Sequence, residues 1–273
     1  MGAIDPLTEM RSASSGAAPA GTQAVDRAMK ILWTIADAGE VTLSSLAHTT
    51  GLTPGTTSRI AKALTAAGLI RRNPLTDAYH LGPGAVVLGR AAEQVLGLDK
   101  ALPMLRQLGR QTSESVNLVV RDGGESVVIM RVESPLPLRF TQAVGARFPL
   151  YSTASGKALL AFTPDAGSYL DTLPEQLPPV APGTLATRTQ LLRQLDEIRE
   201  SGFSVDLEEN VEGVRCVGAP ILDANGVAQA AVVLQAPAIR LRRPRIREVS
   251  GLVIDTAREV QHVLPIEPLL GHR

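Results

Sequence analysis

The sequence predicts an α+β protein with a small helical unit at its N-terminal end and a larger sheet unit after it. Residues 22–83 show three short amphipathic segments followed by two brief alternating segments. The later part of the chain shows strands paired by tight turns, with separate helical segments instead of regular strand–helix alternation. The 273 residues, 44% of them hydrophobic, exceed one typical domain and suffice to bury real cores.

The first helical segment covers residues 22–40. Its apolar residues recur at intervals of three and four and so form one buried face: Val25, Ala28, Ile31, Leu32 and Ile35. Gly39 then ends the helix. Residues 1–21, which precede it, are rich in Ala, Ser, Gly and Pro, and we expect a disordered tail there.

Two further helices complete a helix-turn-helix layout. Thr42 is suited to cap a short helix over residues 43–49, and Gly51 supplies a tight turn after it. The third helix begins near Pro54 and ends at Gly68. Its expected buried set is Ile60, Ala63, Leu64 and Ala67. Three short helices with a glycine turn between the second and third are typical of a helix-turn-helix.

A β-hairpin follows the third helix. Residues 69–72 and 78–81 alternate around a turn-rich loop, and a hairpin in this position is a wing. Residues 22–83 therefore form a predicted winged helix-turn-helix, and residues 84–98 a linker helix.

The start of the third helix carries the residue types that read DNA. Short polar side chains there can contact base edges, and basic side chains can contact phosphate. We assign base contact to Thr57 and Ser58, phosphate or guanine contact to Arg59, and backbone contact to Lys62. The predicted DNA-binding residues are Thr56, Thr57, Ser58, Arg59, Lys62, Arg71 and Arg72.

The local charge of this unit is only weakly positive. Residues 22–82 hold six basic and four acidic side chains, and the whole chain is neutral, with 27 of each sign. Dimerisation would double the phosphate contacts and offset this weakness. The alternative is that the winged helix contacts another protein and that its arginines are an ordinary solvated face.

Residues 99–265 are expected to form the sheet unit, with residues 266–273 as a tail. The predicted helices cover residues 99–113, 155–162, 189–201 and 245–263, and the predicted strands cover 115–120, 126–132, 138–143, 204–208, 217–222 and 227–234. Turn residues at 122–124 and 223–226 predict two hairpins. The proline-rich residues 174–182 are expected to form a surface loop.

Composition argues against several classes of protein. A single cysteine, Cys216, excludes an intrachain disulfide and fits a cytoplasmic location, and no stretch is apolar enough to span a membrane. The rival hypothesis is a small hydrolase that uses Cys216 as its nucleophile. That thiol would need a nearby base, but the four histidines lie in the winged helix or at the C-terminal end. We expect no catalytic residue, metal or cofactor.

Three segments are distinctive enough to compare with known families. They are VDRAMKILWTIADAGEVTLSSLAHTTGLTPGTTSRIAKALTAAGLIRR, VGARFPLYSTASGKALLAF and GFSVDLEENVEGVRCVGAPILD. In this order they resemble the DNA-binding domain and two later segments of the IclR family of bacterial regulators. The resemblance implies a GAF-like effector-binding domain, assembly into homodimers or tetramers, and an affinity for a double-stranded DNA operator that changes when a small organic ligand binds. The anion-receptive helix end predicted in STASGKALLA makes a small organic acid the expected ligand. Repression and activation both remain open.

The effector site is expected at the start of the helix in STASGKALLA. Free amides of Ala154, Ser155 and Gly156 would form an anion-receptive helix end there. The resemblance adds Asp206 as a polar pocket residue and Phe140, Val214 and Cys216 as wall residues. Val233 and Gln235 stand where pocket serines are common in the family. The alternative is that Gly156 only permits close packing and that Lys157 is a surface charge.

Overall fold

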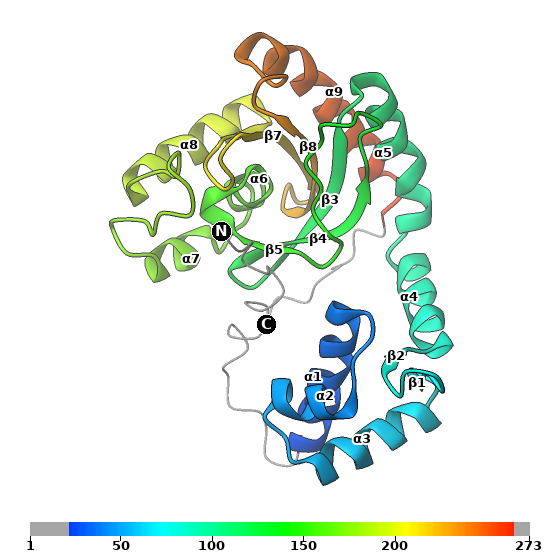
Figure 1. The fold of residues 1–273 in the computed structure, drawn as a ribbon. Helices are drawn as coiled ribbons and strands as arrows, with labels where there is room; N and C mark the ends of the chain where they lie inside the picture. Colours follow the sequence, from blue (N-terminus) through cyan, green and yellow to red (C-terminus); the bar gives the residue numbers. More distant parts are fainter. Residues whose placement is uncertain (1–21, 265–273) are drawn as a thin grey trace. The chain divides into compact units, whose positions relative to one another are not determined.

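The computed structural model describes residues 22–264, so both predicted tails, residues 1–21 and 266–273, lie outside the described residues. The chain divides into two compact units, and the boundary in the sequence lies between Gln94 and Val95 (Figure 1). Each unit has its own hydrophobic core. The α+β fold class, with a helical unit followed by a sheet unit, is confirmed.

The first unit is a winged helix-turn-helix. Its elements are α1 (Gln23–Ala38), α2 (Leu43–Thr50), α3 (Pro54–Ala66), β1 (Ile70–Arg72), β2 (Tyr79–Leu81) and α4 (Pro83–Val95). Thr42 and Thr53 cap α2 and α3 by accepting the amides three residues later, and Gly51 takes the left-handed conformation between the two helices. The wing pairs β1 with β2 in antiparallel register.

The buried face of α3 differs from the expected one. Thr57, Ala61 and Leu64 are buried, whereas Ala63 is exposed and Ile60 is only half-buried. Thr57 is polar, but its hydroxyl donates to the Thr53 carbonyl at 3.0 Å, so the helix itself satisfies that group. The prediction of the buried face considered apolar residues alone, and it therefore missed Thr57 and turned the face away from its true position.

The second unit is built on one six-stranded sheet. Its strands are β3 (Ser115–Asp122), β4 (Glu125–Val132), β5 (Arg147–Pro149), β6 (Ser204–Leu207), β7 (Val214–Leu222) and β8 (Ala228–Pro237). Its helices are α5 (Leu98–Thr112), the 3-10 turn η2 (Leu150–Ser152), α6 (Ala154–Ala161), α7 (Ala166–Thr172), α8 (Arg188–Ser201) and α9 (Arg243–Gln261). The strand order is β5-β4-β3-β8-β7-β6, and every pair is antiparallel.

Helices cover both faces of this sheet. Figure 1 shows α6 in the hollow of the curved sheet and α5 with α9 on its outer face. Strand β8 illustrates why both faces are apolar, because Val232 and Leu234 join the outer core while Ala231 and Val233 join the inner one. A cavity lies on the inner face, between the sheet and the start of α6.

One prediction about this unit is wrong, and two short elements were not predicted. Residues 138–143 form no strand, and the segment between β4 and β5 has no helix or strand. Pro135 and Pro137 stand at its start and cannot donate to a sheet ladder, which favours a loop. The short strand β5 takes the edge position beside β4 instead, and α7 was also not predicted.

Candidate functional site

The outward face of α3 is formed by residues spaced three and four apart. Gly55, Arg59, Lys62 and Ala66 are all exposed and lie opposite the buried side of the helix. Two of the four, Gly55 and Ala66, are small and flank the two cations, so the helix backbone can approach a partner closely on either side of them. Thr56 and Ser58 are half-buried beside this face, and the Thr56 hydroxyl accepts a hydrogen bond from Thr53 at 3.0 Å.

Thr57 does not belong to this face. Its side chain is completely buried, so the prediction that it contacts a DNA base is wrong. The physical reason is its position one turn before Ala61, on the side that packs against the core of the unit. Ser58 is left as the short polar side chain nearest the outward face.

The two wing arginines differ in their partners. Arg72 pairs with Asp77 across the wing loop, and both side chains stay more than half exposed. Arg71 lies opposite His80 in the strand register and is exposed. Because the Asp77 carboxylate already neutralises Arg72, Arg71 is the better placed of the two for a phosphate.

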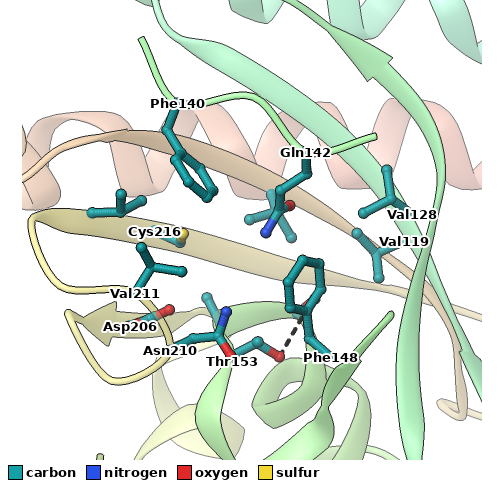
Figure 2. A pocket seen from close by; sticks show the side chains of 14 residues that line it. Val119, Val128, Phe140, Gln142, Phe148, Thr153, Asp206, Asn210, Val211 and Cys216 are labelled. Carbon is teal, nitrogen blue, oxygen red and sulfur yellow. Dashed lines mark hydrogen bonds between the residues drawn. The ribbon is translucent and has the colours of Figure 1, made fainter. Parts of the chain in front are cut away.

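One enclosed cavity lies between the inner face of the sheet, α6 and the loop after β4 (Figure 2). Its volume is about 20 Å³. Seven of the nine predicted effector residues line it: Phe140, Ala154, Ser155, Asp206, Val214, Cys216 and Val233. The strand register explains their convergence, because Asp206 pairs with Cys216 across β6 and β7 and Val233 lies on the neighbouring strand. Their role in binding stays a prediction.

Gly156 and Gln235 do not line the cavity. A Cβ on Gly156 would lie 2.2 Å from the Leu150 carbonyl oxygen, so this glycine permits α6 to pack against η2, as the alternative interpretation held. Gln235 is buried, and its Nε2 donates to the Phe140 carbonyl at 3.4 Å. It therefore supports the loop that carries Phe140.

The start of α6 points free amides at the cavity. Thr153 is the N-cap, and its hydroxyl accepts the Gly156 amide at 3.0 Å. Gly156 is thus not one of the free donors that the sequence predicted. Across residues 22–264, no acceptor is paired with the amides of Ala154 and Ser155, and both residues line the cavity. These two groups can receive an anion.

Lys157 is not the surface charge of the alternative interpretation. Its side chain is 0% exposed, and its Nζ lies 2.6 Å from the Glu209 carboxylate and 2.7 Å from Gln194 Oε1. The Glu209 amide donates to Asp206 Oδ1 at 2.7 Å, which connects this buried ion pair to the cavity wall.

Burial disfavours the charged form of both ionisable groups in the cavity wall, Asp206 and Cys216. Burial raises the pKa of Asp206 to about 7; the Glu209 carboxylate raises it too, and Lys157 opposes the rise. Burial also raises the pKa of the Cys216 thiol well above its usual range. A neutral, buried thiol is a poor nucleophile, and no histidine lines the cavity.

Seven lining residues were not foreseen: Val119, Val128, Gln142, Phe148, Thr153, Asn210 and Val211. Figure 2 shows Phe140 and Gln142 on one side of the cavity and Asp206, Asn210 and Thr153 on the other. Thr153 lies directly before α6 and is a preferred N-cap residue type, so the sequence did contain a signal for its position at the helix start. Gln142 and Phe148 come from a loop and an edge strand whose path no pattern predicted.

Residues 22–264 hold no group of three or more His, Cys, Asp or Glu side chains suited to a metal ion. None of their helices combines the length and the apolar character that a membrane crossing requires.

Comparison with protein families matches both units. Residues 24–74 match the IclR helix-turn-helix domain, and residues 94–262 match the domain described as bacterial transcriptional regulator IclR C-terminal. Together the two matches cover most of the described chain in the order that the sequence motifs indicated.

Individual relatives agree with these matches. The HTH-type transcriptional repressor AllR of Escherichia coli is 32% identical over 251 residues, which cover 90% of this chain and 92% of AllR. The crystal structure of IclR from Thermotoga maritima superimposes with a TM-score of 0.72 at 30% identity, covering 87% and 97% of the two chains. An IclR homologue from Microbacterium hydrocarbonoxydans, solved with 4-hydroxybenzoate, superimposes with a TM-score of 0.73 at 22% identity, covering 86% and 99%.

Proposed function

Because the chain belongs to the IclR family of bacterial transcriptional regulators, we propose that its helix-turn-helix unit binds one operator sequence in double-stranded DNA and that a small organic acid modulates this binding. The relatives are named as regulators and not as enzymes. The partners are then the operator, the acid and further copies of the same chain, in the bacterial cytoplasm.

The observation that carries the DNA proposal is the outward face of α3. Arg59 and Lys62 are exposed there without an acidic partner among the residues that the structure describes. An arginine beside small residues can enter the major groove and bond the O6 and N7 atoms of guanine. Lys62, one turn further along the helix, is placed to contact a phosphate.

Self-association is supported by apolar side chains that the first unit leaves exposed. Val25, Met29 and Trp33 follow one another at intervals of four along α1 and are 61%, 42% and 49% exposed. Helix α4 buries none of its own residues. We infer that these surfaces are covered in a homodimer or tetramer, which also doubles the number of cations that face DNA.

The effector proposal rests on the free amides at the start of α6. A carboxylate is the group that two unpaired helix N-terminal amides favour, and 4-hydroxybenzoate, bound by the Microbacterium homologue, is a carboxylic acid. The cavity of about 20 Å³ has room for about one water. Binding therefore requires the loop that carries Phe140 and Gln142 to move outward, and such a rearrangement supplies the second state that regulation needs.

A binding assay with the Arg59→Ala variant tests the DNA proposal. Operator sequences are first enriched from random DNA with the purified full chain, and affinities are then measured by fluorescence anisotropy. We expect the variant to bind about 10- to 100-fold more weakly, since it loses a bidentate base contact or a phosphate contact. Its oligomeric state should not change.

Two further variants serve as controls for that assay. Arg193→Ala removes an exposed arginine from α8 in the other unit and should leave the affinity unchanged. Thr57→Val alters a buried side chain and should keep the sequence preference. An Arg59→Ala protein that binds its operator as tightly as the wild type at physiological salt would show that this face does not contact DNA.

A further inference from the structure

The cavity provides no positive charge for an acid. Of the fourteen residues that line it, Asp206 is the only carboxylic acid, and none is a lysine, arginine or histidine. An effector carboxylate held by the Ala154 and Ser155 amides would therefore share a small, closed space with the carboxyl group of Asp206. Two anions confined to one closed cavity repel each other strongly, because little water is present to screen their charges.

The charged groups around Asp206 do not relieve this repulsion. From α6, Lys157 faces it, but the Lys157 ammonium is already paired with Glu209 at 2.6 Å. From the loop after β6, Glu209 adds a negative charge, and from β7 the Cys216 thiol is neutral. Another nearby pair, Glu208 with Arg215 at 2.8 Å, is also internally neutralised. An entering carboxylate thus finds no unpaired cation.

A proton can replace the missing cation. A protonated carboxyl group donates one hydrogen bond, which turns the repulsive contact into a short, charge-assisted one. We infer that the effector binds as its carboxylate to the form of the protein in which Asp206 is protonated, so that effector binding takes up a proton from solvent. This inference rests on the proposed effector function and specifies how the site recognises its ligand.

The protonation state of the free protein fits this requirement. Burial raises the pKa of Asp206 to about 7, so the protonated form is well populated near neutral pH without a ligand. A simple organic acid has a pKa of about 4 and therefore stays ionised near neutral pH. The titration that limits binding is then that of Asp206.

The expected pH dependence has a definite sign. The protonated fraction of Asp206 falls as the pH rises through about 7, and the apparent dissociation constant rises in inverse proportion to that fraction. Between about pH 6 and about pH 8 the affinity for the acid should fall about tenfold. Proton uptake per bound acid should grow across the same interval, from nearly none to nearly one.

Calorimetry on the wild-type chain measures the proton directly. The probes are 4-hydroxybenzoate and pyruvate, each titrated at about pH 6, about pH 7 and about pH 8 in two buffers of different ionisation enthalpy. The difference in apparent binding enthalpy between the buffers gives the number of protons taken up. Binding of either probe without uptake at the highest pH would overturn the proton inference while leaving the effector proposal intact. If neither probe binds at any pH, the carboxylate effector itself is wrong and this inference fails with it.

A substitution at Asp206 provides the second test. Asp206→Asn keeps an oxygen to accept the Glu209 amide and places an amide donor where the protonated acid has its O–H. The variant should bind the acid at all three pH values with one affinity and no proton uptake. Glu212→Gln, which neutralises an exposed carboxylate of the same loop, should retain the wild-type pH dependence. An Asp206→Asn variant with the wild-type slope would assign the proton to another group and contradict the inference.

Discussion

The ion pair between Lys157 and Glu209 is the most deeply buried charge interaction among residues 22–264. Both side chains are almost inaccessible, and Gln194 supplies a further acceptor for the ammonium. The pair joins α6, which presents the amides of the cavity, to the loop that positions Asp206. A buried pair of this kind contributes little net stability by itself, but the removal of one partner leaves an uncompensated charge.

Lys157→Met tests this role. Methionine nearly matches the lysine stem in volume, so the main effect is the loss of the ammonium that balances Glu209. We expect the free energy of unfolding to fall by about 3–5 kcal/mol, measured by urea denaturation at neutral pH. The surface substitution Lys100→Met, in the first turn of α5, should change it by less than about 0.5 kcal/mol. A Lys157→Met protein as stable as the wild type would show that Glu209 does not need its partner.

Single residues of the site were predictable to the extent that local chemistry determines them. Asp206 and Cys216 lie in strands whose pairing places them opposite each other, so the family resemblance and the geometry agree. Lys157 could not be recognised as buried, because Glu209 lies 52 residues further along the chain. Thr57 was misassigned because a hydroxyl that bonds its own helix can occupy a core position.

Elements with a sequence period or a strong turn were predicted well. The hairpin of β7 and β8 is one example, since Asp223 Oδ1 accepts the amides of Asn225 and Val227 in its turn. The failures lie in segments whose conformation depends on tertiary contacts. Residues 138–143 alternate like a strand, yet Phe140 and Gln142 point toward the cavity and the backbone pairs with no strand. Short edge elements such as β5 depend on the neighbour beside them.

Helix α6 depends on one glycine for its position. Gly156→Ala would place a methyl group 2.2 Å from the Leu150 carbonyl oxygen, and backbone atoms cannot yield as a flexible side chain can. We expect a loss of at least about 2 kcal/mol in the free energy of unfolding and a weaker affinity for the acid probes, because α6 must shift away from η2. Thermal or urea denaturation and calorimetry measure the two effects.

A matched glycine in α7 provides the control. Gly167 is exposed, and a Cβ added there meets no atom within 4 Å. Gly167→Ala should therefore be neutral or stabilise the protein by up to about 1 kcal/mol through helix propensity. Equal effects of the two substitutions would mean that the close approach of α6 to η2 has no energetic importance.

At the scale of the whole molecule, the two units have separate cores and separate sites. The outward face of α3 belongs to the first unit, and the cavity belongs to the second. The chain passes from one to the other at the end of α4. Regulation then requires that the two sites share a free energy of coupling, since a ligand that binds two states equally shifts no equilibrium.

Thermodynamic linkage makes this coupling testable from both directions. If the acid changes operator affinity by a certain factor, saturating operator must change the affinity for the acid by the same factor, which we expect to lie between about 5 and about 150. Anisotropy with and without 4-hydroxybenzoate gives the first factor, and calorimetry with and without operator DNA gives the second. DNA of scrambled sequence should leave the affinity for the acid unchanged. If both factors equal one, the two proposed sites are not coupled, and the basis for effector control is removed.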